Sequence, residues 1–131
     1  MEASIEHLTR GTVRTADVLL LLTEPYYRSL ETLGRMAPLA RDLGIPLVLG
    51  VANKVRNERD EAAIREYAGR RDVEIAGVVP YDDQVSEADR LGRALIDHAP
   101  SAPAVLAITA LAGAIERRWL AAAARPEHPA P

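Results

Sequence analysis

Polar and aromatic side chains follow three apolar runs of this sequence. They occupy residues 24–28, 53–56 and 80–83, and each segment begins where an apolar run ends. Together they offer carboxylates, a carboxamide, cationic groups and tyrosine rings, which can recognise a ligand through hydrogen bonds and stacking. Loops and turns also contain such residues for structural reasons, so any one segment alone is weak evidence. Their recurrence after three successive runs favours a binding site.

The second segment, Asn53-Lys54-Val55-Arg56, resembles the Asn-Lys-x-Asp loop with which GTPases recognise guanine. In that loop the final carboxylate accepts hydrogen bonds from the guanine edge. Arg56 stands at this position here, and a guanidinium has only donors. The carboxamide of Asn53 has both a donor and an acceptor, so it can pair with the amino group and a ring nitrogen of adenine. The segment therefore favours adenine over guanine.

The three apolar runs, residues 17–23, 46–52 and 73–79, predict the strands that position these segments. None shows the strict alternation of a strand with one face in water, so we expect both faces to be covered, as in a parallel sheet. Ligands bind beyond the carboxyl ends of such strands, where all three polar segments would lie. The predicted fold class is α/β, with a partial parallel sheet flanked by helices in three layers.

Two helices are predicted between the strands. Residues 29–43 have apolar positions at helical spacing, with Ser29 as the expected N-cap and Gly44 as the stop. Pro38 lies inside this stretch and should kink or divide it. Residues 58–70 place a few apolar side chains among charges, which predicts an amphipathic surface helix.

Two further helices are predicted after the third strand, over residues 85–98 and 104–124. The last of them has an apolar stripe formed by Val105, Ile108, Leu111, Ile115 and Trp119, which docking on the sheet would explain. We expect residues 1–124 to form one domain and the proline-rich residues 125–131 to be a disordered tail.

Composition argues against several classes of function. The chain has 131 residues, of which 16 are basic and 19 acidic, and its net charge of −3 gives no basic footprint for nucleic acid. Cysteine is absent, so neither a disulfide nor a thiolate metal site can form. The longest dense apolar run, residues 18–22, is too short to span a membrane, and no signal-peptide pattern is present. We therefore expect a cytoplasmic protein that contacts neither nucleic acid nor membrane.

Two acidic groups could bind a metal, but structural roles explain them better. The first group is Glu2, Glu6 and His7, in which the sequence neighbours Glu6 and His7 point about 100° apart on a helix. The second group comprises Asp82, Asp83, Glu87 and Asp89. These carboxylates lie near the start of a predicted helix, where they stabilise the helix dipole. We expect no metal site, and the lack of a nucleophile motif such as Gly-x-Ser-x-Gly predicts no catalytic residue of that kind.

Several segments, in order and with compatible spacing, resemble the C-terminal portion of MinD/ParA-type P-loop ATPases. They are residues 2–12, 24–32, 53–56, 80–82 and 87–92. The resemblance covers nearly all of residues 1–96. It is closest to the CooC-type subgroup, the ATPases that insert nickel into carbon monoxide dehydrogenase.

The resemblance implies a P-loop NTPase-like fold and a site for ATP. Asn53 would contact adenine, and the wider base pocket would involve Asn53, Lys54, Arg56, Pro80, Tyr81 and Asp82. Glu2 and Glu6 would belong to the switch region that follows the Walker B strand. At Ser4 the family usually has glycine, a departure that could restrict the backbone of this switch.

The family's phosphate-binding loop, Lys-Gly-Gly-x-Gly-Lys-Thr, precedes the matched region, and these residues contain no Gly-x-x-x-x-Gly-Lys. The resemblance therefore implies that Mg²⁺-dependent ATP hydrolysis requires a partner, either an N-terminal P-loop half or a homologous ATPase subunit. A metalloenzyme would be the client. Two interpretations stay open: one half of an ATPase for metallocentre maturation, or a non-catalytic interaction domain that pairs with a related ATPase.

Overall fold

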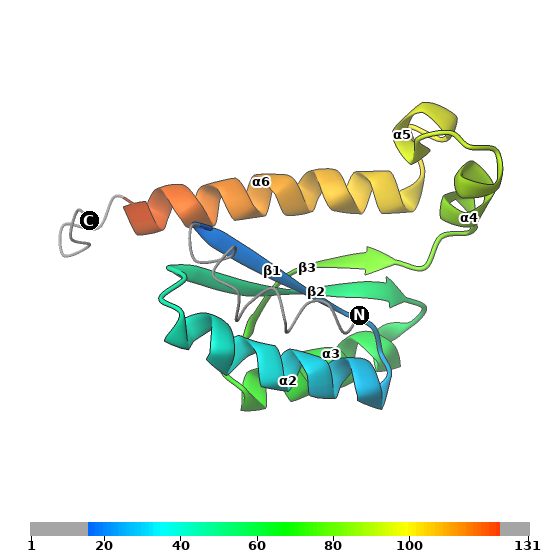
Figure 1. Ribbon diagram of the computed structural model, residues 1–131. Coiled ribbons are helices and arrows are strands. Elements are labelled where there is room, and N and C mark those ends of the chain that lie inside the picture. The colour runs from blue at the N-terminus through cyan, green and yellow to red at the C-terminus, as the bar shows by residue number, and fades with distance from the viewer. Residues whose placement is uncertain (1–15, 124–131) are drawn as a thin grey trace.

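The computed structural model describes residues 16–123, which form a parallel sheet with helices on both faces (Figure 1). The strands are β1 (Val18–Thr23), β2 (Leu47–Val55) and β3 (Glu74–Pro80), and they lie side by side in the order β1-β2-β3. Both neighbouring pairs are parallel. The predicted α/β class and the three parallel strands are confirmed.

The helices form the outer layers. Helices α2 (Tyr27–Asp42) and α3 (Glu58–Arg70) connect the strands and cover one face of the sheet, whereas α6 (Pro103–Ala123) runs across the other face (Figure 1). The short helices α4 (Asp83–Arg90) and α5 (Leu95–His98) lie beyond the carboxyl ends of the strands. Burial on both sides explains why the strands lack a polar alternation.

The core is divided by the sheet. On one side, Leu21 and Ile64 belong to clusters of apolar side chains between the sheet and helices α2 and α3. On the other, Val51 and Val79 pack against Ala104 of α6. Helix α6 comes so close to β3 that a Cβ atom built on Gly77 would lie 2.8 Å from a Leu111 methyl carbon.

Helix α2 differs from the prediction at its start. It begins at Tyr27, the N-cap position is Tyr26 without a side-chain hydrogen bond, and Ser29 lies inside the first turn. Ser29 was therefore wrongly predicted as the cap; its hydroxyl instead accepts a hydrogen bond from the Glu24 backbone. Pro38 does not divide the helix, and Gly44, with a φ of 80°, follows its end as predicted.

The predicted helix over residues 85–98 is wrong, because the structure contains α4 and α5 instead. Gly92 has a φ of 67°, a left-handed conformation that ends α4, and the Arg93 amide donates to the Ala88 carbonyl. By contrast, α3 spans the predicted residues 58–70. No helix in the described part of the chain is long and apolar enough to cross a membrane.

Candidate functional site

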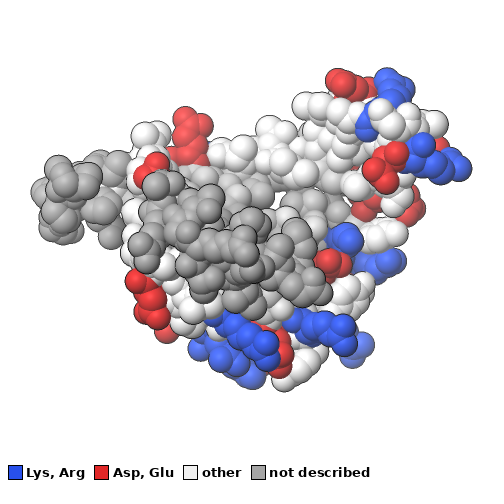
Figure 2. Space-filling view, viewed as in Figure 1, with Lys and Arg blue, Asp and Glu red and all other residues white. Residues whose placement is uncertain are grey.

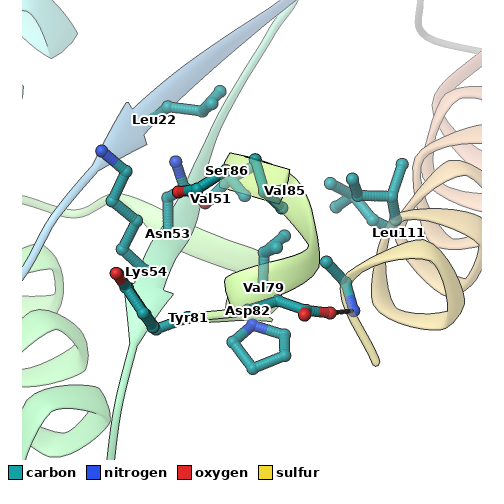
Figure 3. A pocket seen from close by; sticks show the side chains of 13 residues that line it. Leu22, Val51, Asn53, Lys54, Val79, Tyr81, Asp82, Val85, Ser86 and Leu111 are labelled. Atoms are coloured by element: carbon teal, nitrogen blue, oxygen red, sulfur yellow. Dashed lines mark hydrogen bonds between the residues drawn. The ribbon is translucent and has the colours of Figure 1, made fainter. Parts of the chain in front are cut away.

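The strands β2 and β3 end at a pocket of about 480 Å³ between the sheet, α4 and the start of α6 (Figure 3). Its walls are mainly apolar, with a few polar groups; those from the strands and helices include Leu22, Val51, Val79, Val85, Ser86, Ala104, Ile108 and Leu111. This combination of size, apolar walls and few polar groups is typical of sites for small molecules.

Five of the predicted site residues line this pocket, namely Asn53, Lys54, Pro80, Tyr81 and Asp82. They come from the ends of two neighbouring parallel strands, as the sheet geometry predicts. Arg56 is not among the lining residues. Its guanidinium carbon lies 3.9 Å from the centroid of the Tyr81 ring, so Arg56 supports a wall of the pocket from outside.

The end of β2 is longer than predicted. Asn53 and Lys54 were expected in a loop, but the strand continues through them to Val55. Asn53 is half-buried and borders the pocket as well as a second cavity of about 530 Å³ near β1 and α2. Asn53 and Ser86 of α4 both line the pocket (Figure 3). The carboxamide therefore lies on a strand, which holds it more firmly than a loop would.

Lys54 connects the pocket rim to the end of β1. Its Nζ lies 3.6 Å from Oε1 of Glu24. Both side chains are partly exposed, so this ion pair adds little to the stability of the fold. Its significance is geometric, because it joins two of the three polar segments at the carboxyl edge of the sheet.

Thr23 and Ser29 fix the turn that carries Glu24. Thr23 is fully buried, and its hydroxyl lies 3.1 Å from that of Ser29, which also accepts a hydrogen bond of 2.9 Å from the Glu24 amide. Thr23 was not predicted from the sequence as a site residue. Its position as the hydroxyl side chain that ends a leucine-rich strand is the signal that could have found it.

The Asp82 carboxylate accepts hydrogen bonds from the N-termini of two helices. One carboxylate oxygen accepts a hydrogen bond of 2.9 Å from the Gln84 amide in α4, and the other accepts one of 3.0 Å from the Ala104 amide in α6. The prediction that Asp82 stabilises the start of a helix is therefore confirmed, with Asp82 as the N-cap of α4. The residue shapes the pocket by joining β3, α4 and α6, and it is one of the lining residues.

The other predicted site residues lie in parts of the chain that the structure does not describe. Glu2, Glu6 and His7 lie outside the described residues, as do residues 124–131. Figure 2 shows basic and acidic side chains interspersed over the described surface on this face of the molecule.

Sequence comparison relates the chain to ATP-binding proteins, although no protein-family model matches it. It is 39% identical over 101 residues to the carbon monoxide dehydrogenase accessory protein CooC of Rhodospirillum rubrum, covering 77% of this chain and 38% of CooC. It is 45% identical over 96 residues to an uncharacterized ATP-binding protein of Methanocaldococcus jannaschii, covering 71% of this chain and 36% of that protein. The chain thus spans little more than a third of the length of these relatives.

Solved structures share the fold. The MinD cell division protein of Aquifex aeolicus superimposes with a TM-score of 0.69 at 20% identity, covering 80% of this chain and 46% of that one. The cell division ATPase MinD of Pyrococcus furiosus gives a TM-score of 0.68 at 23% identity, covering 83% and 46%. Sequence and fold together show that the chain belongs to the MinD/ParA-like ATPases, corresponds to their C-terminal portion and is close to CooC.

Proposed function

We propose that this chain is the adenine-nucleotide-binding portion of a MinD/CooC-like ATPase, with the base bound in the pocket at the ends of β2 and β3. The position of Asn53 carries the proposal, because it places a carboxamide among apolar walls that can cover the faces of a base (Figure 3). A carboxamide both donates and accepts, which matches adjacent amino and ring-nitrogen groups of adenine. The similarity to an ATP-binding protein supports this ligand.

ATP hydrolysis needs more than this pocket. Phosphoryl transfer depends on a backbone cradle, a lysine and Mg²⁺ around the phosphates, and these 131 residues contain no Gly-x-x-x-x-Gly-Lys. We infer that a P-loop from an N-terminal portion or from a homologous subunit completes the site and holds Mg²⁺ with the phosphates. The likeness to CooC supports a role in metallocentre maturation, with nickel as the metal and a metalloenzyme as client.

The base site can be tested without phosphates. In an NMR titration of the isotope-labelled chain, adenosine should shift the amide signals of Asn53, Tyr81 and Ser86, and guanosine should shift them less. Binding will be weak, because base contacts alone must offset the entropy of association. Equal responses to both nucleosides, or shifts scattered away from the pocket, would contradict the assignment.

Two substitutions of Asn53 sharpen this test. Asn53→Ala removes the carboxamide and should weaken adenosine binding by at least about fivefold, the effect of losing two hydrogen bonds. Asn53→Asp keeps the shape but replaces the amino donor by a second acceptor, so it should abolish the preference for adenosine. Asp83→Ala is the matched control, since Asp83 is exposed and does not line the pocket.

The alternative function is a non-catalytic domain that pairs with a related ATPase. One observation favours it: Leu22 of β1 is 62% exposed, and within residues 16–123 that strand pairs only with β2. Tight binding to a P-loop-bearing ATPase, combined with no response to either nucleoside, would favour this alternative.

A further inference from the structure

The side chains of β2 change their alternation at Lys54. Val51 packs toward α6, whereas Ala52 packs toward α2 and α3. In a regular strand Asn53 would face α6, Lys54 would face α3, and Val55 would face α6 again. Val55 instead is 8% exposed and belongs to the cluster on the α2 and α3 side, with Leu30, Ala52 and Ile64. The alternation is therefore reset between Asn53 and Val55.

A β-bulge produces this reset. Ala52 is paired with Val78 and Val55 with Pro80, so two residues of β2, Asn53 and Lys54, lie opposite one residue of β3. Lys54 has a φ of 56°, a left-handed conformation that is uncommon for a residue with a side chain. Bulges of this kind insert a residue and redirect side chains, often beside functional sites.

The bulge satisfies two requirements that a regular strand cannot satisfy together. Asn53 borders the pocket, and Val55 is buried beneath α3. In a regular strand without the bulge, the Lys54 ammonium would point into the apolar cluster around Ile64, where an unpaired charge is strongly unfavourable. With it, the ammonium reaches the rim and lies 3.6 Å from the Glu24 carboxylate.

We propose that the left-handed conformation of Lys54 is a specificity-determining feature, because it lets the Asn53 carboxamide face the base pocket while Val55 stays buried beneath α3. The inference rests on the proposed adenine site. Lys54 acts through its backbone as a positioning residue, and its ammonium need not touch the base.

Two variants separate the backbone from the charge. Both Lys54→Gly and Lys54→Val remove the ammonium, but glycine adopts a positive φ without steric cost, whereas a β-branched side chain strongly disfavours it. The ratio of adenosine to guanosine affinity should be at least about fivefold lower in Lys54→Val than in Lys54→Gly, given the penalty of the left-handed conformation. An equal loss in both variants would overturn the proposal, because the charge would then be responsible.

A second measurement separates positioning from stability. Urea unfolding reports the stability of each variant, while nuclear Overhauser contacts between the Asn53 side-chain amide and the side chains that line the pocket report its orientation without ligand. We expect these contacts in Lys54→Gly and their loss in Lys54→Val. A destabilised Lys54→Val that keeps both the contacts and the affinity ratio would overturn the proposal. If Lys54→Val does not fold, Lys54→Ala, with a smaller side chain, gives the same comparison.

The ligand-free measurement also separates the two proposals. A wild-type chain that prefers neither nucleoside would remove the adenine assignment. The contacts of Asn53 would still show whether Lys54 positions it, and their persistence in Lys54→Val would refute the positioning role independently.

Discussion

Asp82 combines two structural tasks in a single side chain, because its carboxylate caps α4 and also accepts a hydrogen bond from the start of α6. Removing both charge-assisted hydrogen bonds in Asp82→Ala should lower the free energy of unfolding by about 1–3 kcal/mol. Asp82→Asn keeps one oxygen acceptor and should lose about half of that. Urea denaturation measures both changes.

Asp83→Ala provides the matched control for that prediction. Asp83 is the next residue, lies in the first turn of α4 and is exposed. Its removal should change the free energy of unfolding by less than about 0.5 kcal/mol. Equal effects of the two alanine substitutions would show that Asp82 does not join the helices in solution.

Only part of the site could be predicted from the sequence. Asn53, Lys54 and Tyr81 border one pocket because parallel strands end at one edge, and this needs only the strand pattern. The bulge at Lys54 was not predicted, because its register depends on how Val55 packs beneath α3. Arg56 was assigned to the base pocket but stacks on Tyr81 instead, a contact between distant residues that spacing alone does not specify.

At the scale of elements, two exposed glycines should respond to alanine in opposite ways. Gly44 has a φ of 80° beyond α2, whereas Gly69 lies inside α3, and a Cβ atom would meet no neighbour within 4 Å at either site. Gly44→Ala should lower the free energy of unfolding by about 1–2 kcal/mol through the left-handed penalty. Gly69→Ala should raise it by up to about 1 kcal/mol through helix propensity. Thermal or urea unfolding of both variants provides the comparison, and a change of the same sign in both would contradict it.

Local signals explain which elements the sequence predicts. Helix α3 has acidic residues in its first turn and an Asn57 cap that accepts from the Asp60 amide, so its bounds follow from its own residues. The break between α4 and α5 depends on the left-handed Gly92, which a pattern of apolar spacing does not distinguish from a tolerated helical glycine. The start of α2 follows from the buried contact between Ser29 and Thr23, which joins a strand to a helix.

For the whole molecule, we expect no ATP hydrolysis by the purified 131-residue chain. The described pocket offers apolar walls and a carboxamide for a base, whereas the rate of phosphoryl transfer comes from groups around the phosphates. Phosphate release in the presence of Mg²⁺ should stay at background. Mg²⁺-dependent turnover without an added partner would show that a different phosphate site exists in this chain.

Strand β1 lies at one edge of the described sheet. Within residues 16–123, β1 pairs on one side only, Leu22 is 62% exposed, and a third cavity lies beside Val18, Ile115 and Trp119 of the same region. An apolar strand with unpaired backbone groups is a template for another chain. We therefore expect the 131-residue chain to self-associate, with a sedimentation coefficient and an unfolding midpoint that rise with protein concentration.

Leu22→Lys tests whether this edge is responsible. A charged side chain on an edge strand opposes pairing, and Leu22 is too exposed to contribute much to the core. The variant should remain folded and sediment closer to the monomer. Adding the P-loop-bearing portion of CooC should suppress the self-association of the wild-type chain by occupying the same edge. A wild-type chain that is a monodisperse monomer, with cooperative unfolding independent of concentration, would contradict this expectation and would favour a self-sufficient interaction domain over one portion of a larger sheet.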